Sequence, residues 1–332
     1  MIKTLDRTEI GIVIGLPVLI VLGFVLPEWI VNYIQVSLGT GLVALGVMIQ
    51  MRAGLVSFGQ GLYFCIGGYA AGLAGKFAGI SDLFVLLALG ILASVSISFI
   101  LGFLLRRYRE IFYAMLSLAV SMILFGLLSS LEVLGSTDGF NLPHATYLGW
   151  APEDDTAGHV LYIATCIPVF LCAFLLNRYL RSPMGYIGEA IRENELRVEY
   201  LGASAHQAVH IKYVIAAAVS GVGGVLWALA LGHVDPEMTN WTTSGQFVFV
   251  SILSGTGNIV APLFGTFILE IVRVYAVEAS PNTWQMILGV VMLLTVIFLP
   301  KGLWSIVKRL NLSPNRNHHQ SKTTTDHPTA GE

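Results

Sequence analysis

The sequence predicts an all-α membrane protein that crosses the bilayer about ten times. Three observations support this fold class. Hydrophobic residues make up 55% of the chain and charged residues only 11%, whereas soluble domains contain about 25% charged residues. Apolar runs of about 20 residues recur along the chain, and each is long enough to cross a bilayer as a helix. The 35 glycines are typical of membrane helices whose backbones pack closely.

The expected helices follow one another at short intervals. Ten apolar segments fit the pattern: 11–27, 30–50, 57–80, 82–105, 111–134, 158–177, 211–232, 245–258, 259–279 and 284–300. The segment 245–258 is too short to cross a bilayer at about 1.5 Å per residue. We expect a half-helix or a re-entrant segment there, which needs protein or a water-filled cavity around it. Residues 1–310 form the expected transmembrane domain, and the polar residues 311–332 form an expected disordered cytoplasmic tail.

Lysine and arginine set the expected orientation, because short cytoplasmic loops carry an excess of both. Basic clusters lie at residues 3–7, at 52, at 106–109, at 178–212 and from 301 onward. The loops 136–155 and 233–241 contain acidic residues but no Lys or Arg. Ten spans with both ends in the cytoplasm place every basic cluster inside and both acidic loops outside. Lys76 alone does not fit, because it comes out near the outer surface.

Residues 178–210 form the longest internal cytoplasmic loop on this topology. Ser182 and Pro183 can open a helix, Gly202 can end it, and Ser204 can cap a second short helix. The apolar seam of the first helix is expected at residues with three- and four-residue spacing, namely Ile187, Ile191, Asn194, Val198 and Leu201. The loop therefore predicts an amphipathic helix at 185–202.

The polar face of this helix indicates what it contacts. It carries four Glu and two Arg between residues 189 and 199, whereas helices that rest on a bilayer usually have a face rich in Lys and Arg. We therefore favour a protein partner over the alternative of a helix lying on lipid. The expected contact comprises Glu189, Ala190, Ile191, Arg192, Glu195, Val198 and Gly202. Ile191 and Val198 are the expected anchors in a groove, and the charged residues are expected at its rim.

Two motifs that suggest other chemistry are incomplete. Lys76 follows a glycine, but Phe77 stands where a P-loop needs Ser or Thr, so no nucleotide site is expected in this chain. His206 and His210 have the spacing of zinc ligands on a helix, but the Glu that a zinc protease needs after the first His is missing. We interpret this pair as incidental and expect no metal site. The net charge of −2 gives no argument for nucleic acid.

Polar residues inside the spans are candidates for a solute pathway. Ser57, Gln60 and Tyr63 begin a glycine-rich span, and free N–H groups at such a start face the cavity in broken transporter helices. The alternative is close helix packing through small residues. A proton-coupled carrier usually needs a carboxylate near the membrane centre, and Glu270 is the one serious candidate. Arg273 follows it by three residues, which also fits a structural pair.

Five segments resemble, in order, the motifs of the branched-chain amino acid permease family of ABC importers, LivM type. The segment GEAIRENELRVEYLGAS (188–204) resembles the family's cytoplasmic coupling segment. The other four are GLVSFGQGLYFCIGGYAAGL (54–73), REIFYAMLSLAVSMI (109–123), STDGFNLP (136–143) and FLPKGLW (298–304). There are departures. Ser117 stands where Thr is common, and SGTGNIVAPLFG (254–265) differs from the usual glycine-rich pattern at Ser254, Asn258 and Ala261.

The resemblance implies a membrane subunit of an importer for branched-chain amino acids in the bacterial cytoplasmic membrane. It implies that ATPase subunits dock on the coupling helix and hydrolyse ATP, so this chain is neither an enzyme nor the holder of a cofactor. A second homologous permease subunit and a periplasmic solute-binding protein are the other implied partners. Ser117, Thr137 and Asn141 join the expected pathway residues.

Other functions remain open at this point. Related permeases serve urea, short amides and other amino acids, and the departures concern the substrate more than the fold. A stand-alone secondary carrier is an alternative of another class, and it predicts transport without an ATPase. An intramembrane enzyme needs a paired nucleophile and base, or metal ligands, at one membrane depth, and the sequence offers none.

Overall fold

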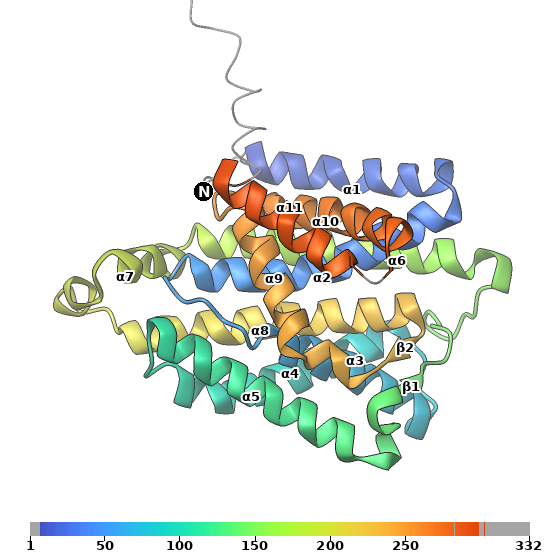
Figure 1. The fold of residues 1–332 in the computed structure, drawn as a ribbon, viewed down its shortest axis with the longest axis horizontal. Coiled ribbons are helices and arrows are strands. Elements are labelled where there is room, and N and C mark those ends of the chain that lie inside the picture. Colours follow the sequence, from blue (N-terminus) through green and yellow to red (C-terminus); the bar gives the residue numbers. More distant parts are fainter. Residues whose placement is uncertain (1–6, 282, 299–301, 303–332) are drawn as a thin grey trace, which may run out of the picture.

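The computed structural model describes residues 7–281, 283–298 and 302. The described chain is built almost entirely of helices, and α7 projects from one end of the bundle (Figure 1). These helices are α1 (Arg7–Val25), α2 (Glu28–Met51), α3 (Gln60–Ala78), α4 (Leu83–Leu105), α5 (Glu110–Ser130), α6 (Asp154–Leu180), α7 (Pro183–Tyr200), α8 (Ala205–Leu231), α9 (Trp241–Ser254), α10 (Val260–Ala279) and α11 (Trp284–Phe298). The expected tail at 311–332 lies outside the described residues.

The helices agree with the predicted spans. Seven of those in the described residues are long and apolar enough to cross a membrane, namely α1, α2, α4, α5, α6, α8 and α10. The glycine-rich α3 lies among them, and α9 and α11 are shorter, with 14 and 15 residues. Every predicted segment corresponds to a helix. The chain is therefore an all-α, multi-pass membrane protein, as the composition predicted.

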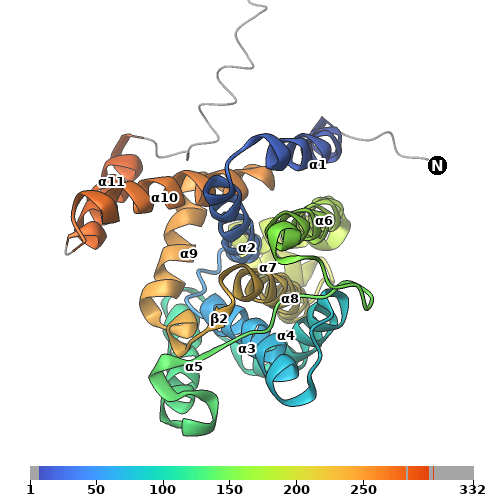
Figure 2. The same ribbon diagram turned by 90° about the vertical axis from the view of Figure 1, so that its right-hand side faces the viewer.

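The core of the bundle is formed by α2, α3 and α8, with α8 packed between the other two (Figure 2). Their backbones touch at glycines. A Cβ on Gly67 would overlap the backbone of Gly221, and one on Gly223 would overlap the carbonyl oxygen of Gly39. Small residues at such contacts let membrane helices approach closely. The many glycines therefore set the spacing of this central trio.

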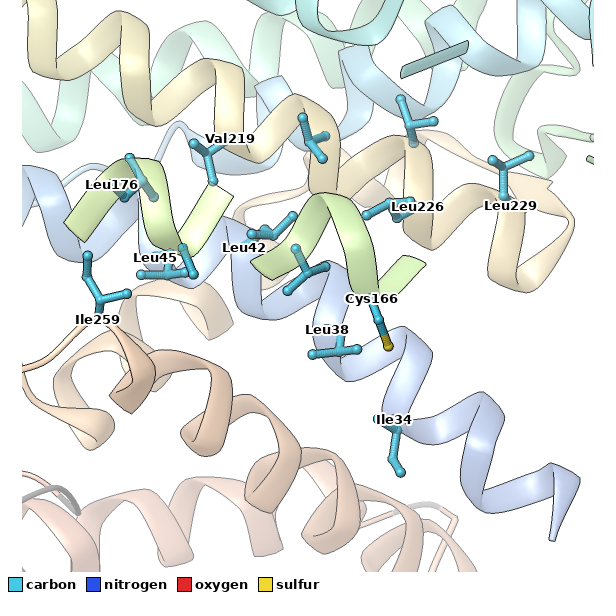
Figure 3. Close-up of a cluster of buried hydrophobic side chains, with 14 of the residues drawn as sticks. Ile34, Leu38, Leu42, Leu45, Cys166, Leu176, Val219, Leu226, Leu229 and Ile259 are labelled. Atoms are coloured by element: carbon cyan, nitrogen blue, oxygen red, sulfur yellow. The ribbon is translucent and has the colours of Figure 1, made fainter. Parts of the chain in front are cut away.

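An aliphatic layer joins α6 to the central helices. Buried side chains of α2, α6 and α8 interdigitate, among them Leu38, Cys166 and Leu226 (Figure 3). The cysteine is packed as a small apolar side chain, and it is not part of a disulfide. In contrast, α4 and α5 expose large apolar side chains such as Phe99, Phe112 and Ile123, as expected for helices that face lipid.

The loop before α9 enters the protein instead of staying at the outer surface. Strands β1 (Phe140–Asn141) and β2 (His233–Val234) pair antiparallel, and the 3-10 turn η3 (Pro236–Thr239) follows. The Thr239 side chain and backbone bond to Ser121, halfway along α5, at 2.8–3.2 Å. The placement of the 233–241 loop on the outside stays a prediction, and the structure adds that its turn is bonded to the middle of α5. The re-entrant turn forms because its polar backbone groups find partners inside the protein.

The cation at Lys76, which did not fit the predicted topology, has a local explanation. Its Nζ donates to the carbonyl oxygen of Val133 at 3.2 Å and lies 4.7 Å from the ring centroid of Phe140. A carbonyl and an aromatic face can hold one ammonium group at the outer end of α3. Within α10, Glu270 and Arg273 form an ion pair at 3.6 Å, which supports the structural interpretation of these two residues.

Candidate functional site

The loop at 178–210 begins and ends with the caps that the sequence predicted. Ser182 Oγ accepts from the backbone N–H of Gly185, and Pro183 is the first residue of α7. Gly202 has a left-handed backbone with φ of 87°. Ser204 Oγ accepts from the N–H of Gln207. The second helix is not short, however, because Ser204 caps the 27-residue α8, which continues through the membrane.

The predicted single seam of α7 is wrong at two positions. Asn194 has a non-helical backbone (φ −162°, ψ 102°), so α7 consists of two helical pieces joined at a kink. Its Oδ1 accepts from the N–H of Arg197 at 2.9 Å and thereby caps the second piece. Leu201 is 81% exposed and does not continue the buried face. The three- and four-residue spacing of the apolar residues holds within each helical piece but does not continue across the kink at Asn194.

Polar contacts fix α7 to three spans in the described chain. Arg109, at the start of α5, donates from Nε and Nη2 to both carboxylate oxygens of Glu195 at 2.8 and 2.7 Å. Arg52, at the end of α2, lies 3.3 Å from Glu189. Burial lowers the pKa of Arg52, and the charge of Glu189 opposes that shift. Lys212 of α8 is buried and donates to the carbonyl oxygen of Gly185 at 3.2 Å.

The two predicted anchors point into the chain itself. Ile191 and Val198 are only 6% and 5% exposed, and they belong to a core with residues of α3, α5 and α8. Their expected role as anchors in a partner's groove is therefore wrong, and the reason is that an amphipathic pattern identifies a buried face but not what buries it. Glu189 and Glu195 likewise have partners within the chain. Ala190 and Arg192 are exposed beside them.

A different set of apolar side chains faces outward. Leu196 is 66% exposed, Tyr200 is 89% exposed, and Leu201 is 81% exposed. They lie on the second helical piece and at its end, where α7 projects furthest from the bundle (Figure 1). We call these three residues the α7 tip. Three large apolar groups this exposed, outside the membrane helices, mark an interaction surface.

The histidine pair at the start of α8 does not come together. His206 is exposed and lies 3.9 Å from Glu199. His210, one turn further along the helix, is buried against the rings of Phe99 and Phe103. The two rings therefore lie in different surroundings, and His206 instead lies near Glu195 and Glu199. The absence of a metal site stays a prediction.

Four of the six predicted pathway residues meet in one buried cluster. The chain unwinds after α2, and the next helix begins at Gln60, close to the predicted start. In the unwound segment the N–H of Phe58 donates to Ser117 Oγ at 3.1 Å, and the N–H of Gly59 donates to Ser57 Oγ at 3.2 Å. Gln60 Oε1 accepts from Ser220 Oγ at 2.7 Å. Side-chain hydroxyls thus satisfy N–H groups at a broken helix.

Tyrosines complete this buried cluster. Tyr63 donates to the hydroxyl of Tyr213 at 2.6 Å, and Tyr113 donates to Gln50 Oε1 at 3.2 Å. All four side chains are buried. Gln50, Tyr113 and Tyr213 were missed from the sequence. The usable signal was the lone amide of Gln50 in an apolar run, because a buried amide needs a hydrogen-bond partner.

The other two predicted residues lie elsewhere. Thr137 is exposed in the 3-10 turn η2 (Ser136–Asp138). Asn141 is in β1, and its Oδ1 lies 2.8 Å from Nδ1 of His233. The outer loops therefore hold Thr137 and Asn141, and the interior holds Ser57, Gln60, Tyr63 and Ser117. Their functional roles stay predictions.

Comparison with known proteins identifies the family of the chain. A model of the branched-chain amino acid transport system permease component matches residues 29–296. The high-affinity branched-chain amino acid transport permease LivM of Escherichia coli K12 is 28% identical over 292 residues, which cover 81% of this chain and 67% of that protein. The LivH permease of the same organism is 25% identical, covering 81% and 92%. A probable LivM of Methanocaldococcus jannaschii is 27% identical, covering 73% and 77%.

No solved structure matches the chain. The family match spans every helix from α2 to α10 and most of α11, and it includes both the braced cytoplasmic loop and the buried polar cluster. The chain therefore belongs to the family of permease components of branched-chain amino acid transport systems.

Proposed function

We propose that this chain is a membrane-spanning subunit of an ATP-driven importer that carries branched-chain amino acids into the bacterial cytoplasm. The membership of the family and the names of the relatives support this solute class. The chain itself holds no cofactor. Separate cytoplasmic ATPase subunits supply the energy by hydrolysing ATP, and the location is the cytoplasmic membrane.

The bracing of α7 is the observation that carries the proposal. The exposed α7 tip is available to an ATPase subunit, while Glu189, Glu195 and Gly185 tie the same helix to α2, α5 and α8. A push on the tip therefore moves three spans together. Those spans also contribute Gln50, Ser117 and Tyr213 to the buried cluster, so closure of the ATPase can reach the pathway without a separate relay.

The partner subunits follow from the same reasoning. Both LivM and LivH permeases align with this chain over most of its length, which supports a second, homologous subunit that completes the pore. An external solute-binding protein docks on the outer face formed by the 136–155 loop. The buried cluster around Gln60 is the closed inner part of the pathway, and it opens when the ATPase subunits close on ATP.

The test is uptake by the reconstituted complex. Proteoliposomes that contain both permease subunits and the ATPase, with ATP inside and the binding protein outside, should accumulate labelled leucine, isoleucine and valine. Urea, short amides and aromatic amino acids should compete weakly. Uptake that continues with hydrolysis-deficient ATPase, driven by an ion gradient, would refute the proposal in favour of a secondary carrier.

A further inference from the structure

A polar cavity lies at the cytoplasmic ends of the spans, next to the coupling loop. Its volume is about 310 Å³, and its walls come from the start of α1, the ends of α2 and α6, the first half of α7 and the turn between α9 and α10. Small-molecule sites usually occupy about 300–1,000 Å³, so the space suits one small solute. It is separate from the buried cluster around Gln60, whose residues do not line it.

The lining carries charges of both signs. Arg52 and Arg181 lie in the walls together with Glu189, and Asn177, Asn258 and Tyr186 add uncharged polar groups. Arg52 Nε donates to the carbonyl oxygen of Thr256 at 2.9 Å, so its guanidinium is held in place. A simple anion would meet the Glu189 carboxylate, and a metal cation would meet two guanidinium groups. A mixed lining favours a ligand that is itself positive at one end and negative at the other.

An unsatisfied donor strengthens the case for a ligand. Asn177 of α6 lines the cavity and is only 6% exposed. Its Nδ2 has no hydrogen-bond partner among the residues that the structure describes. A buried donor left in this state costs about 1–3 kcal/mol, so such groups are usually satisfied by another molecule. This nitrogen is enclosed by protein in the structure, so it donates to a carboxylate in the cavity once the amide turns toward the ligand.

We propose that the cavity binds a free zwitterionic amino acid from the cytoplasm and that its occupancy slows import. The ligand's carboxylate accepts from Asn177 Nδ2 and lies near Arg181, and its ammonium group lies near Glu189. Leu180 and Ile259, which also line the cavity, contact a small apolar side chain. The identity of this ligand with the imported solute rests on the proposed function.

The inhibition of import follows from the fact that different helices form the walls of the cavity. Glu189 belongs to α7, which has to move if the ATPase drives it, whereas Asn177 belongs to α6 and Asn258 to the α9–α10 turn. A ligand that bridges these elements binds one arrangement of them better than any other, so it shifts the population toward that arrangement. At an internal concentration ten times its Kd, the free, working fraction falls about tenfold.

The experiment measures initial uptake of labelled leucine by the reconstituted complex, with unlabelled leucine either present or absent inside the vesicles. Internal leucine at ten times its Kd should lower uptake by the original chain about tenfold. Asn177→Leu should keep the uncompeted rate and lose the inhibition. Asn32→Leu is the matched control, because it makes the same change at the outer end of α2, and it should stay inhibited.

Two analogues test the zwitterion. 4-Methylpentanoate lacks the ammonium group of leucine and isoamylamine lacks the carboxylate, so each should inhibit far less than leucine from inside. Inhibition by 4-methylpentanoate as strong as that by leucine would show an anion site and overturn the assignment. Unchanged uptake in the presence of internal leucine, or equal inhibition of Asn177→Leu, would also overturn it.

A binding measurement separates this inference from the proposed function. The purified complex, without ATP and without the solute-binding protein, should bind labelled leucine at equilibrium, and Asn177→Leu should bind at least tenfold more weakly. A complex that fails to take up leucine contradicts the proposed function, but the cavity is then still tested by this arm. Equal binding by the original chain and Asn177→Leu refutes the cavity site.

Discussion

Arg109→Gln should uncouple ATP hydrolysis from transport by removing the brace between α5 and the coupling loop. The magnitude follows from the contact. Two charge-assisted hydrogen bonds join Arg109 to Glu195, but the side chains keep 24% and 29% of their surface exposed, so solvent screens the pair. The guanidinium is also held by the carbonyl oxygens of Arg106 and Tyr108, which reduces the entropy lost on pairing.

These terms place the pair near the upper end of the range for partly exposed ion pairs, at about 1 kcal/mol. If that energy favours the coupled over the uncoupled arrangement, the number of solute molecules moved per ATP should fall about fivefold. The assay measures uptake and phosphate release in the same proteoliposomes. ATP hydrolysis should persist, because the variant leaves the exposed α7 tip unchanged.

Three further proteins complete this test. Glu195→Gln should reproduce the loss, and the exchanged pair Arg109→Glu with Glu195→Arg should recover part of it. Arg107→Gln is the control, since Arg107 is an exposed arginine of the same loop. The reasoning is refuted if Arg109→Gln transports with an unchanged solute-to-ATP ratio, or if the Arg107 control loses coupling to the same extent.

Three other predictions concern the same loop and the topology. Leu196→Asp should abolish co-purification of the ATPase while the chain still inserts, and the α7 tip is not the docking surface if this variant retains the ATPase. Ile191→Asp should instead lower the free energy of unfolding of the chain by about 2–5 kcal/mol, as other losses in a packed core do. Gly202→Ala should lower the melting temperature of the complex, because a left-handed residue with a Cβ costs about 1–2 kcal/mol, and an unchanged temperature argues against that backbone. A cysteine at Asp138 should react with an impermeant thiol reagent from outside and one at Glu193 should not; reversed labelling overturns the orientation.

The local features of the loop were predictable because capping depends on neighbouring residues. Ser182, Gly202 and Ser204 each act within a few residues of their own positions, and the structure places each as predicted. The kink at Asn194 was not predicted, because its spacing placed it in the apolar seam of one continuous helix, whereas its side chain caps a second helical piece. The burial of Ile191 was not predictable either, because it depends on how α7 packs against α8, and the spacing of residues within α7 does not indicate that packing.

Contacts between residues far apart in the sequence explain the remaining differences between the predicted and the observed structure. The bond between Thr239 and Ser121 joins residues 118 positions apart, so no local pattern indicates that the outer loop turns inward. The interior cluster was found in part, because Ser57 and Gln60 are polar residues in a glycine-rich span. Tyr213 was missed because a tyrosine in an apolar helix is usually a packing residue, and only the fold places its hydroxyl beside Tyr63.

The glycine contacts at the centre of the bundle determine which parts can move. Backbones in direct contact, as at Gly67 and Gly221, leave no side chains whose rotamers could absorb a sliding motion. The trio of α2, α3 and α8 therefore moves as one rigid block, together with α7, which is tied to α2 and α8. Alternation between outward and inward access is then a rotation of this block against its less tightly packed neighbours, and a substitution that adds one methyl group at these glycines should push the helices apart and destabilise the whole block.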